Sequence, residues 1–217
     1  MKVLILGGSG IGMIAAYIFK QQAEVGDELL GFLNDNEKPG TWIGKHQFKV
    51  PVLGRSEDVR EHLKRDRETY FFVAYVGIPD RKKQVDFIKS LEIPDDRLVG
   101  CVDRTASIPQ GAVGLGRGCL IGPHAQLGPD VTIGKCVHVL GHAFVGHDTI
   151  VHDYVTLANN AAIGANNDVG EGVFVGTNAA TKEYVRLGRY SVVGMGAVVL
   201  KSTEYRQVVV GNPARAL

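Results

Sequence analysis

The sequence has 217 residues, 24 Lys and Arg against 23 Asp and Glu, a formal net charge of +1 and 45% hydrophobic residues. This length suits one large domain or two small ones, and the balanced charge argues against binding to nucleic acid or an anionic membrane. The apolar run that opens MKVLILGGSGIG is too short to span a membrane and lacks a signal-peptide cleavage region. We therefore expect a soluble, cytoplasmic protein without membrane insertion.

Residues 1–102 alternate strand-like and helix-like segments. The expected strands are Lys2–Leu6, Leu29–Leu33, Tyr70–Val76 and Leu98–Val102, and the expected helices are Met13 to about Gln22, Arg55–Arg67 and Asp80–Leu91. This alternation predicts an α/β domain with a small, Rossmann-like parallel sheet flanked by helices. Ligands of such sheets bind at the carboxyl ends of the strands.

Residues 103–217 follow a different pattern, a repeat of six. Large aliphatic residues recur at this spacing, with one miss at Thr181, at Leu115, Ile121, Leu127, Ile133, Val139, Val145, Val151, Leu157, Ile163, Val169, Val175, Leu187, Val193 and Val199. A small or β-branched residue follows four positions after each, except at Asn167. This repeat predicts an all-β, left-handed parallel β-helix with about eighteen residues in each triangular coil.

Within a coil, the aliphatic and small residues should fill the interior. We expect the glycines that often follow the aliphatic residue to supply backbone freedom near the corners. Because Thr181 misses the repeat, we expect an irregular corner around it.

The eighteen-residue period also sorts the histidines. His124 and His142 are eighteen residues apart and should stack in a polar column that continues through Asn160 and Asn178. His147 should lie between Pro129 in the coil before and Ala165 in the coil after. The small side chain of Ala165 would leave room for a ligand beside His147.

Three motifs carry a resemblance to a known family: GGSGIG with FLND near the start, VGHD in the repeat, and GAVVLK followed by VVVGNPAR at the end. Together they resemble the hexapeptide-repeat sugar O- and N-acetyltransferases, in the branch of the sialic acid O-acetyltransferase and the bacillosamine-pathway N-acetyltransferase. The resemblance covers essentially the whole chain. It implies an acetyl-CoA-dependent acyltransferase and a homotrimer, with acetyl-CoA bound along the β-helix in the groove between two subunits.

The resemblance makes His147 the general base and Asp148 the residue that orients it. Transfer of an acetyl group to an amine needs a base, which histidine supplies near neutral pH, and a hydrogen-bond donor for the oxyanion. The backbone of Ala165 is a candidate donor because of its stacking on His147. Adjacent side chains of a strand point to opposite faces, so Asp148 can reach His147 only where a corner bends the backbone. His142 is a further candidate for substrate contact, although a place in the polar column is the simpler interpretation.

In the front domain the resemblance implies a site for the nucleotide of a sugar nucleotide. Ser9, Gly10 and Ile11 match the loop that contacts it, Asn34 and Asp35 match an acidic pair near the base or ribose, and Gly77 matches a backbone contact. The simpler alternative for Gly10 and Gly12 is close packing of helix on strand. The loop reads GxxGxG, with Met13 in the place of the last dinucleotide-site glycine, and it does not indicate a dehydrogenase.

For acetyl-CoA, the resemblance assigns pantetheine or acetyl contacts to Thr156, Ala165, Thr177 and Met195. Lys201 and Arg215 are candidate partners for the CoA phosphates, with solvated surface charge as the alternative. Thr156 stands where some relatives have a histidine, and Leu140 where relatives can have a polar residue. These two departures leave the detail of the contacts open.

Cys101, Cys119 and Cys136 form neither a CxxC pair nor a disulfide framework, so we expect buried thiols. Cys119 falls on a small interior position. We therefore expect direct transfer in a ternary complex rather than an acyl-enzyme.

The leading hypothesis is an N-acetyltransferase for a nucleotide-linked amino sugar, of the UDP-, GDP- or dTDP-4-amino-4,6-dideoxy type, in surface glycan synthesis. The nearest alternative is a sugar O-acetyltransferase of the sialic acid type. A γ-carbonic-anhydrase-like metalloenzyme is remote, because Ala106 and Gly111 stand where a third histidine ligand would be needed, and we expect no metal. A non-catalytic scaffold is equally remote.

Overall fold

A computed structural model describes residues 1–76 and 79–217 and divides the chain into two compact units. The first comprises Met1–Val76 and Asp86–Cys101, and the second comprises Val102–Leu217 with a short segment that ends at Val85. In the described part of the chain, no helix has the length and apolar character needed to cross a membrane.

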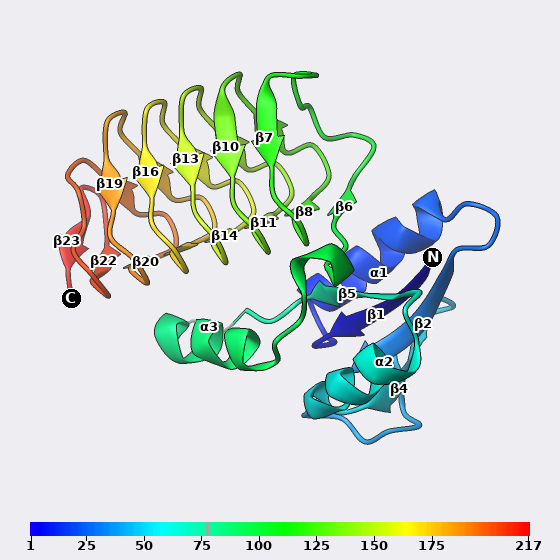
Figure 1. Cartoon of the computed structure of the whole chain (residues 1–217). Helices are drawn as coiled ribbons and strands as arrows, with labels where there is room; N and C mark the ends of the chain where they lie inside the picture. The colour runs from blue at the N-terminus through cyan, green and yellow to red at the C-terminus, as the bar shows by residue number, and fades with distance from the viewer. Residues whose placement is uncertain (77–78) are drawn as a thin grey trace. The chain divides into compact units, whose positions relative to one another are not determined.

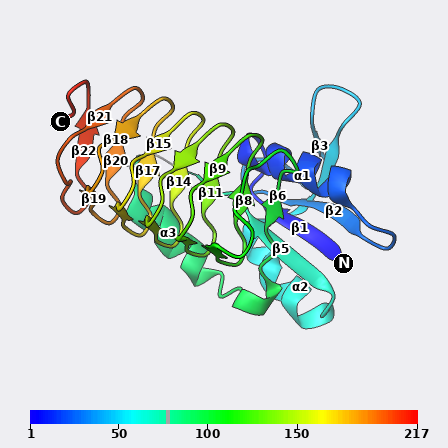
Figure 2. The same cartoon turned by 90° about the horizontal axis from the view of Figure 1, so that it is seen from above.

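The first unit is built on a five-stranded sheet in the order β3-β4-β2-β1-β5 (Figures 1 and 2). Its strands are β1 (Lys2–Leu6), β2 (Glu28–Leu33), β3 (Trp42–Ile43), β4 (Val50–Gly54) and β5 (Thr69–Val73). All neighbours pair in parallel except the antiparallel pair β3 and β4. The helices are α1 (Ile11–Gln22), α2 (Val59–Arg65), α3 (Arg81–Ser90), which begins in the second unit, and the 3-10 turns η1 (Ser56–Asp58) and η2 (Asp95–Arg97).

Both faces of this sheet are buried, which explains its nearly continuous apolar strands. Leu4 and Leu6 of β1 pack in a core cluster with Val59 of α2. On the α1 side, a Cβ added to Gly12 would lie 3.3 Å from Phe32 and 3.6 Å from Ile5. The α/β organisation predicted for this part of the chain is therefore present.

The strand predictions for this unit were wrong in two respects. The predicted strand Leu98–Val102 splits, because Leu98 makes only an isolated bridge to Phe71 and β6 (Cys101–Val102) joins a sheet of the β-helix. In addition, the sequence pattern did not predict the parallel strand β4. A proline at its second position, Pro51, is tolerated because proline occurs at sheet edges and near strand starts.

The second unit is a parallel β-helix of three sheets. Sheet I contains β7, β10, β13, β16 and β19, sheet II runs from β6 through β8, β11, β14, β17, β20 and β22 to β23, and sheet III contains β9, β12, β15, β18 and β21 (Figures 1 and 2). The strand bounds are Val113–Leu115 (β7), Leu120–Ile121 (β8), Gln126–Leu127 (β9), Val131–Ile133 (β10), His138–Val139 (β11), Phe144–Val145 (β12), Ile150–Val151 (β13), Thr156–Leu157 (β14), Ala162–Ile163 (β15), Asp168–Val169 (β16), Phe174–Val175 (β17), Ala180–Thr181 (β18), Arg186–Leu187 (β19), Val192–Val193 (β20), Val198–Val199 (β21), Val208–Val210 (β22) and Arg215–Ala216 (β23).

Each residue pairs with the residue eighteen positions later, as in His138 with Thr156 and Phe144 with Ala162. The predicted period is therefore confirmed. The aliphatic and small positions form one continuous core in which Val139, Val145 and Val151 have no exposed surface. Leu115 is the exception, with 42% of its surface exposed. No strand pairs with β7 on its open side, so Leu115 lies at the uncovered end of sheet I.

The corners are formed differently from the prediction. We call the turn from sheet II to sheet III the first corner, the turn from III to I the second and the turn from I to II the third. The residue with a positive φ is the third after the aliphatic residue, as in His142 (59°), Asp148 (57°) and Tyr154 (59°). The glycine directly after the aliphatic residue has another role: a Cβ on Gly146 would lie 2.5 Å from the Ala165 nitrogen. These glycines permit close stacking of coils.

The predicted irregularity around Thr181 is present but confined to one backbone pairing. Ile163 does not pair with Thr181, and the Gly164 N–H donates to the Thr181 hydroxyl at 3.0 Å, while the corner itself, at Tyr184, has the usual φ of 58°. Strand β18 pairs with both neighbours, as in Ala162 with Ala180 and Thr181 with Val199. The two misses of the repeat instead compensate each other, since the Asn167 side-chain amide donates to the Thr181 hydroxyl at 2.5 Å inside the core. A buried polar group with a hydrogen-bond partner is tolerated in a core, so the coil continues unbroken.

The start of α3 belongs to this unit, in which the Arg81 side chain is buried. The Arg81 guanidinium is 4% exposed and donates to the carbonyls of Gly172 (2.9 Å) and Tyr154 (2.8 Å) at the third corner. Burial lowers the pKa of Arg81 to about 10, so the side chain remains charged at neutral pH.

The stacking role of the glycines can be tested with Gly170→Ala. An added Cβ would lie 2.8 Å from the Leu187 carbonyl oxygen and 2.9 Å from the Arg189 nitrogen, both in the next coil. We expect the free energy of unfolding to fall by about 1–3 kcal/mol, the usual cost of overpacking, as measured by chemical denaturation. The control is Gly114→Ala, where the nearest atom lies 3.9 Å away. Equal stability of the two variants would contradict the stacking role.

Candidate active site

The second corner of one coil carries the predicted pair, His147 and Asp148. Asp148 has a φ of 57°, which turns its side chain back toward the preceding residue. Its Oδ2 lies 2.6 Å from His147 Nδ1, so the corner bend needed for this contact is present. Because a carboxylate only accepts hydrogen bonds, the contact places the imidazole proton on Nδ1 and leaves the Nε2 lone pair available.

Both side chains of this pair are accessible to a substrate. His147 is 56% exposed and Asp148 is 53% exposed. Ala165 stacks on this corner in the next coil, and the Asn166 amide donates to the His147 carbonyl at 3.0 Å. In the part of the chain that the structure describes, the Ala165 N–H makes no hydrogen bond. A histidine with a free lone pair therefore lies next to a free backbone donor.

The other histidines of this coil lie elsewhere. The ring of His142 stacks on that of His124 at the first corner, with centroids 5.0 Å apart, as the eighteen-residue spacing predicted. His152 at the third corner lies 2.9 Å from Asp168. The three histidines of one coil thus occupy three corners, and the structure does not bring His142 to the corner of His147. No group of three or more His, Cys, Asp or Glu suited to a metal occurs among the described residues.

The predicted cofactor contacts fall on more than one face. Thr177 and Met195 form one column at the first corner, where Met195 is 79% exposed. Sheet III separates this column from Ala165 at the second corner. Thr156 differs, because it is 1% exposed on sheet II, opposite the second corner. The structure thus does not place the Thr156 side chain with His147.

Lys201 and Arg215 do come together. Both line a cavity of about 430 Å³ near the last coil, with Ser202, Gln207 and Pro213 among the other lining residues. Both side chains are exposed. The arrangement fits the predicted contact with phosphates, which stays a prediction.

In the first unit, Ser9 and Gly10 lie exposed in the loop between β1 and α1, and Ile11 is the first residue of α1. Gly10 has a φ of 70°, and a Cβ there would meet nothing within 4 Å. The loop is therefore open to a ligand at the helix N-terminus. Gly12 packs against Phe32, which is the alternative that the sequence left open. Gly77 lies outside the described residues.

The pair Asn34 and Asp35 divides into two roles. Asn34 is 6% exposed, and its Oδ1 accepts from the Asn36 amide at 2.8 Å. Its side chain supports the loop: a Cβ on Gly8 would lie 2.1 Å from its Nδ2. The predicted contact of Asn34 with a ligand is not supported, whereas the Asp35 side chain, 34% exposed, remains accessible.

Asp35 belongs to a polar cluster that the sequence did not predict. It accepts hydrogen bonds from the Ser56 amide (3.0 Å), the Ser56 hydroxyl (2.5 Å) and the Tyr75 hydroxyl (3.1 Å), and Arg55 Nε lies 3.8 Å away. Burial alone would raise the pKa of Asp35, but the hydrogen bonds from Ser56 and Tyr75 and the Arg55 charge outweigh it and lower the pKa. Burial raises the pKa of Tyr75 to about 12.

The cluster lies where β2, β4 and β5 end. Arg55 and Ser56 follow β4 directly and Tyr75 follows β5. The signal that could have identified them is the position after a strand, but β4 was not predicted, so its end was assigned to a helix. The carboxyl edge of the sheet thus presents the loop of Ser9 and Gly10 together with a fixed carboxylate.

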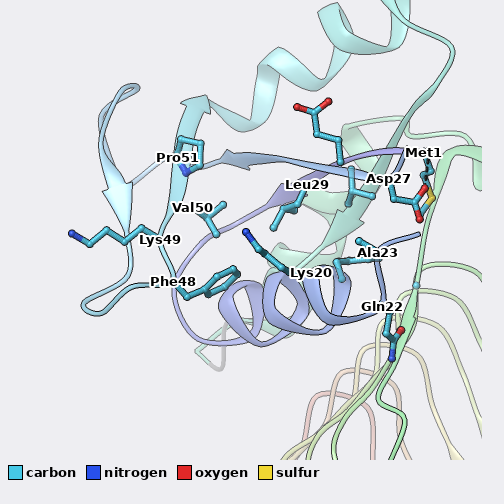
Figure 3. Close-up of a pocket in the computed structure, with 14 residues that line it drawn as sticks. Met1, Lys20, Gln22, Ala23, Asp27, Leu29, Phe48, Lys49, Val50 and Pro51 are labelled. Carbon is cyan, nitrogen blue, oxygen red and sulfur yellow. Dashed lines mark hydrogen bonds and ion pairs between the residues drawn. The ribbon is translucent and has the colours of Figure 1, made fainter. Parts of the chain in front are cut away.

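The first unit has a cavity at the opposite edge of its sheet. It measures about 440 Å³ and is bordered by Met1, Leu29, Lys20, Phe48 and other residues at the starts of the strands and the end of α1 (Figure 3). The Lys20 ammonium lies 5.9 Å from the Phe48 ring centroid. This cavity contains none of the predicted site residues, and ligands of parallel sheets bind at the carboxyl edge. We therefore do not assign the functional site to this cavity on the basis of its volume.

All three cysteines are free and buried, as predicted. Cys119 Sγ lies 3.0 Å from the Gly134 carbonyl oxygen, and burial raises the pKa of its thiol to about 12. A thiol in this state is a poor nucleophile, because the thiolate is the reactive form.

The pKa of Asp35 has a testable consequence for stability. A carboxyl whose pKa is lowered by folding stabilises the native state above its unfolded-state pKa of about 3.9, and this contribution is lost as the pH falls through the folded-state pKa. We expect Asp35→Asn to lower the Tm at pH 7, with a difference from wild type that shrinks below about pH 4. Thermal denaturation between pH 7 and pH 3 measures this, with the exposed Asp96→Asn as control. A constant Tm difference for Asp35→Asn would contradict it.

Comparison with known proteins gives no match to a family model and no match among curated proteins. Solved structures do match. A variant of perosamine N-acetyltransferase from Caulobacter crescentus, in complex with CoA and GDP-perosamine, has 21% identity and a TM-score of 0.83, covering 100% of this chain and 97% of the other. The acetyltransferase domain of PglB from Neisseria gonorrhoeae has 21% identity and a TM-score of 0.85, covering 100% and 99%.

WeeI from Acinetobacter baumannii has 26% identity and a TM-score of 0.80, with both chains covered completely. The likeness thus extends over both units of the chain. This chain has the fold of the hexapeptide-repeat sugar N-acetyltransferases over its whole length, as its sequence predicted.

Proposed function

We propose that this protein is an acetyl-CoA-dependent N-acetyltransferase that acts on a nucleotide-linked amino sugar. The observation that carries the proposal is the second corner of the β-helix, where His147 is held by Asp148 at 2.6 Å next to the free N–H of Ala165. Its support is the fold shared with a GDP-perosamine N-acetyltransferase crystallised with CoA and its sugar nucleotide. We also propose that the β-helix winds in the left-handed sense and that the sheet of the first unit is Rossmann-like.

The pair can perform direct acetyl transfer. His147 Nε2 takes a proton from the attacking amine, whose nitrogen forms a bond to the thioester carbonyl carbon. The Ala165 N–H donates to the oxygen that becomes negative in the tetrahedral intermediate. The carbon–sulfur bond then breaks, and the protonated His147 returns its proton to the leaving thiolate of CoA. Asp148 accepts from Nδ1 throughout and stabilises the imidazolium that forms.

The first unit would bind the nucleotide of the substrate. The open backbone of Ser9 and Gly10 at the start of α1 suits a diphosphate, because a helix N-terminus favours anions. Asp35, oriented by Ser56 and Tyr75, suits a hydrogen-bond donor of the ribose or the base.

A homotrimer with acetyl-CoA between two subunits completes the proposal. Its support is the apolar surface on both sides of the second corner, where Phe144 of sheet III and Ile150 of sheet I are 43% and 46% exposed. Such surface is suited to burial by a second copy of the chain or by the pantetheine arm. The positive cavity of Lys201 and Arg215 would take the CoA phosphates.

The activity can be tested with acetyl-CoA and a panel of UDP-, GDP- and dTDP-linked 4-amino sugars. Thiol release detects transfer, and mass spectrometry of the product distinguishes an amide from an ester. We expect release with at least one amino sugar, because its neutral amine can attack the thioester. Release only with hydroxyl acceptors would favour an O-acetyltransferase, and no release with any acceptor would refute acetyl transfer.

The role of His147 can be tested with His147→Ala. We expect kcat to fall by about 10²–10⁴-fold, the usual contribution of a general base, while the oligomer persists in gel filtration. His152→Ala is the matched control, because His152 also contacts an aspartate, at 2.9 Å, and is 50% exposed at another corner. Unchanged turnover of His147→Ala would remove this residue from the mechanism.

A further inference from the structure

Near the second corner, the interior of the described coils is polar at one place. The interior column behind this corner reads Val131, Thr149, Asn167 and Val185. Thr149 and Asn167 are 0% and 2% exposed. They form a network with Thr181, and the network surrounds Gly164, the residue before the candidate oxyanion donor.

The network holds Gly164 at both of its backbone polar groups. The Gly164 N–H donates to Thr181 Oγ1 at 3.0 Å, and the Thr149 hydroxyl donates to the Gly164 carbonyl oxygen at 3.0 Å. Asn167 connects the two hydroxyls, since its backbone amide donates to Thr149 Oγ1 at 3.2 Å and its side-chain amide donates to Thr181 Oγ1. Asn167 Oδ1 accepts from the Val185 amide at 2.6 Å, so the polar atoms in these bonds have matched donors and acceptors.

The peptide bond from Gly164 to Ala165 transmits this restraint. A trans peptide is planar, with its C=O and N–H pointing in opposite directions. Because Thr149 holds the Gly164 carbonyl toward the interior, the Ala165 N–H of the same peptide points away from the core, on the side of His147. One coil earlier, the residue that corresponds to Thr149 is Val131, which has no donor for the carbonyl of Gly146.

We propose that Thr149, Asn167 and Thr181 are positioning residues for catalysis, which fix the direction of the Ala165 N–H toward the thioester oxygen. This inference rests on the proposed acetyl transfer. The core holds other buried hydroxyls, at Ser191 and Thr203, but the network of Thr149, Asn167 and Thr181 lies beside the corner of His147. An aliphatic column of the kind found at Val137, Val155 and Val173 would fill its space, which favours a positioning role over simple packing. Preorganised donors lower the barrier because they need no reorientation as the oxyanion forms.

The test compares Thr149→Val, which removes the hydroxyl at nearly constant shape, with Thr149→Ser, which keeps it. We expect Thr149→Val to lower kcat about tenfold, less than the ~10²–10³-fold loss when an oxyanion donor is deleted, with little change in KM for acetyl-CoA. Thr149→Ser should restore most of kcat. In infrared spectra of acetyl-CoA labelled with ¹³C at the carbonyl, the thioester band should move to lower wavenumber on binding to wild type and move less on binding to Thr149→Val.

The matched control is Thr203→Val, which removes another buried hydroxyl. Thr203 Oγ1 accepts a hydrogen bond from the Gly188 amide at 3.0 Å at the third corner. We expect the Thr203→Val substitution to leave kcat and the carbonyl band unchanged. If Thr149→Val does not fold, Thr181→Val carries the same test through the Gly164 N–H. Wild-type kcat and band position in Thr149→Val, or an equal loss in Thr203→Val, would overturn the positioning role alone. A wild-type protein that neither binds acetyl-CoA nor releases thiol would instead overturn the proposed function and this inference with it.

Discussion

The left-handed backbone conformation of one residue at each corner is the constraint on which the β-helix depends. Residues such as Asp148, Asn166 and Tyr184 adopt φ values of 56–58°, a conformation that costs roughly 1–2 kcal/mol for residues with a side chain. Asparagine and aspartate tolerate this conformation best. At the second corner this same conformation turns Asp148 back onto His147, so the fold and the orientation of the candidate base have one cause.

Close stacking of the coils is the second requirement of the β-helix. It explains how catalytic groups can come together on the surface of a β-helix. Glycines before the corners let the backbone of one coil approach that of the next, as Gly146 does with Ala165. The approach places the backbone N–H of one coil next to the side chain of another. A candidate oxyanion donor and a candidate base, eighteen residues apart, thereby become neighbours without any insertion or loop.

The sequence predicted most of the β-helix, because its repeat is strict and each period has a physical meaning. It identified the contact of Asp148 with His147 through the corner and the stack of His124 on His142. It did not predict which residue carries the positive φ, since glycine suits both a left-handed turn and a close approach. It also missed β4, and with it the cluster of Ser56, Tyr75 and Asp35, because this short strand carries a proline and its neighbours in space are distant in sequence. The burial of Thr156 was not predictable from the repeat, which does not say what covers each face.

The eighteen-residue pairing also bears on how the length of this chain can change. Deletion of one residue between His147 and Ala165 would shift every later aliphatic residue out of the interior and separate these two residues. Duplication of a complete coil beyond Thr181 would preserve both the core and the spacing of the site, since each coil contacts only its neighbours. A lineage of such proteins can therefore lengthen or shorten by whole coils at the end of the β-helix, whereas the two coils that contain His147 and Ala165 have to remain adjacent.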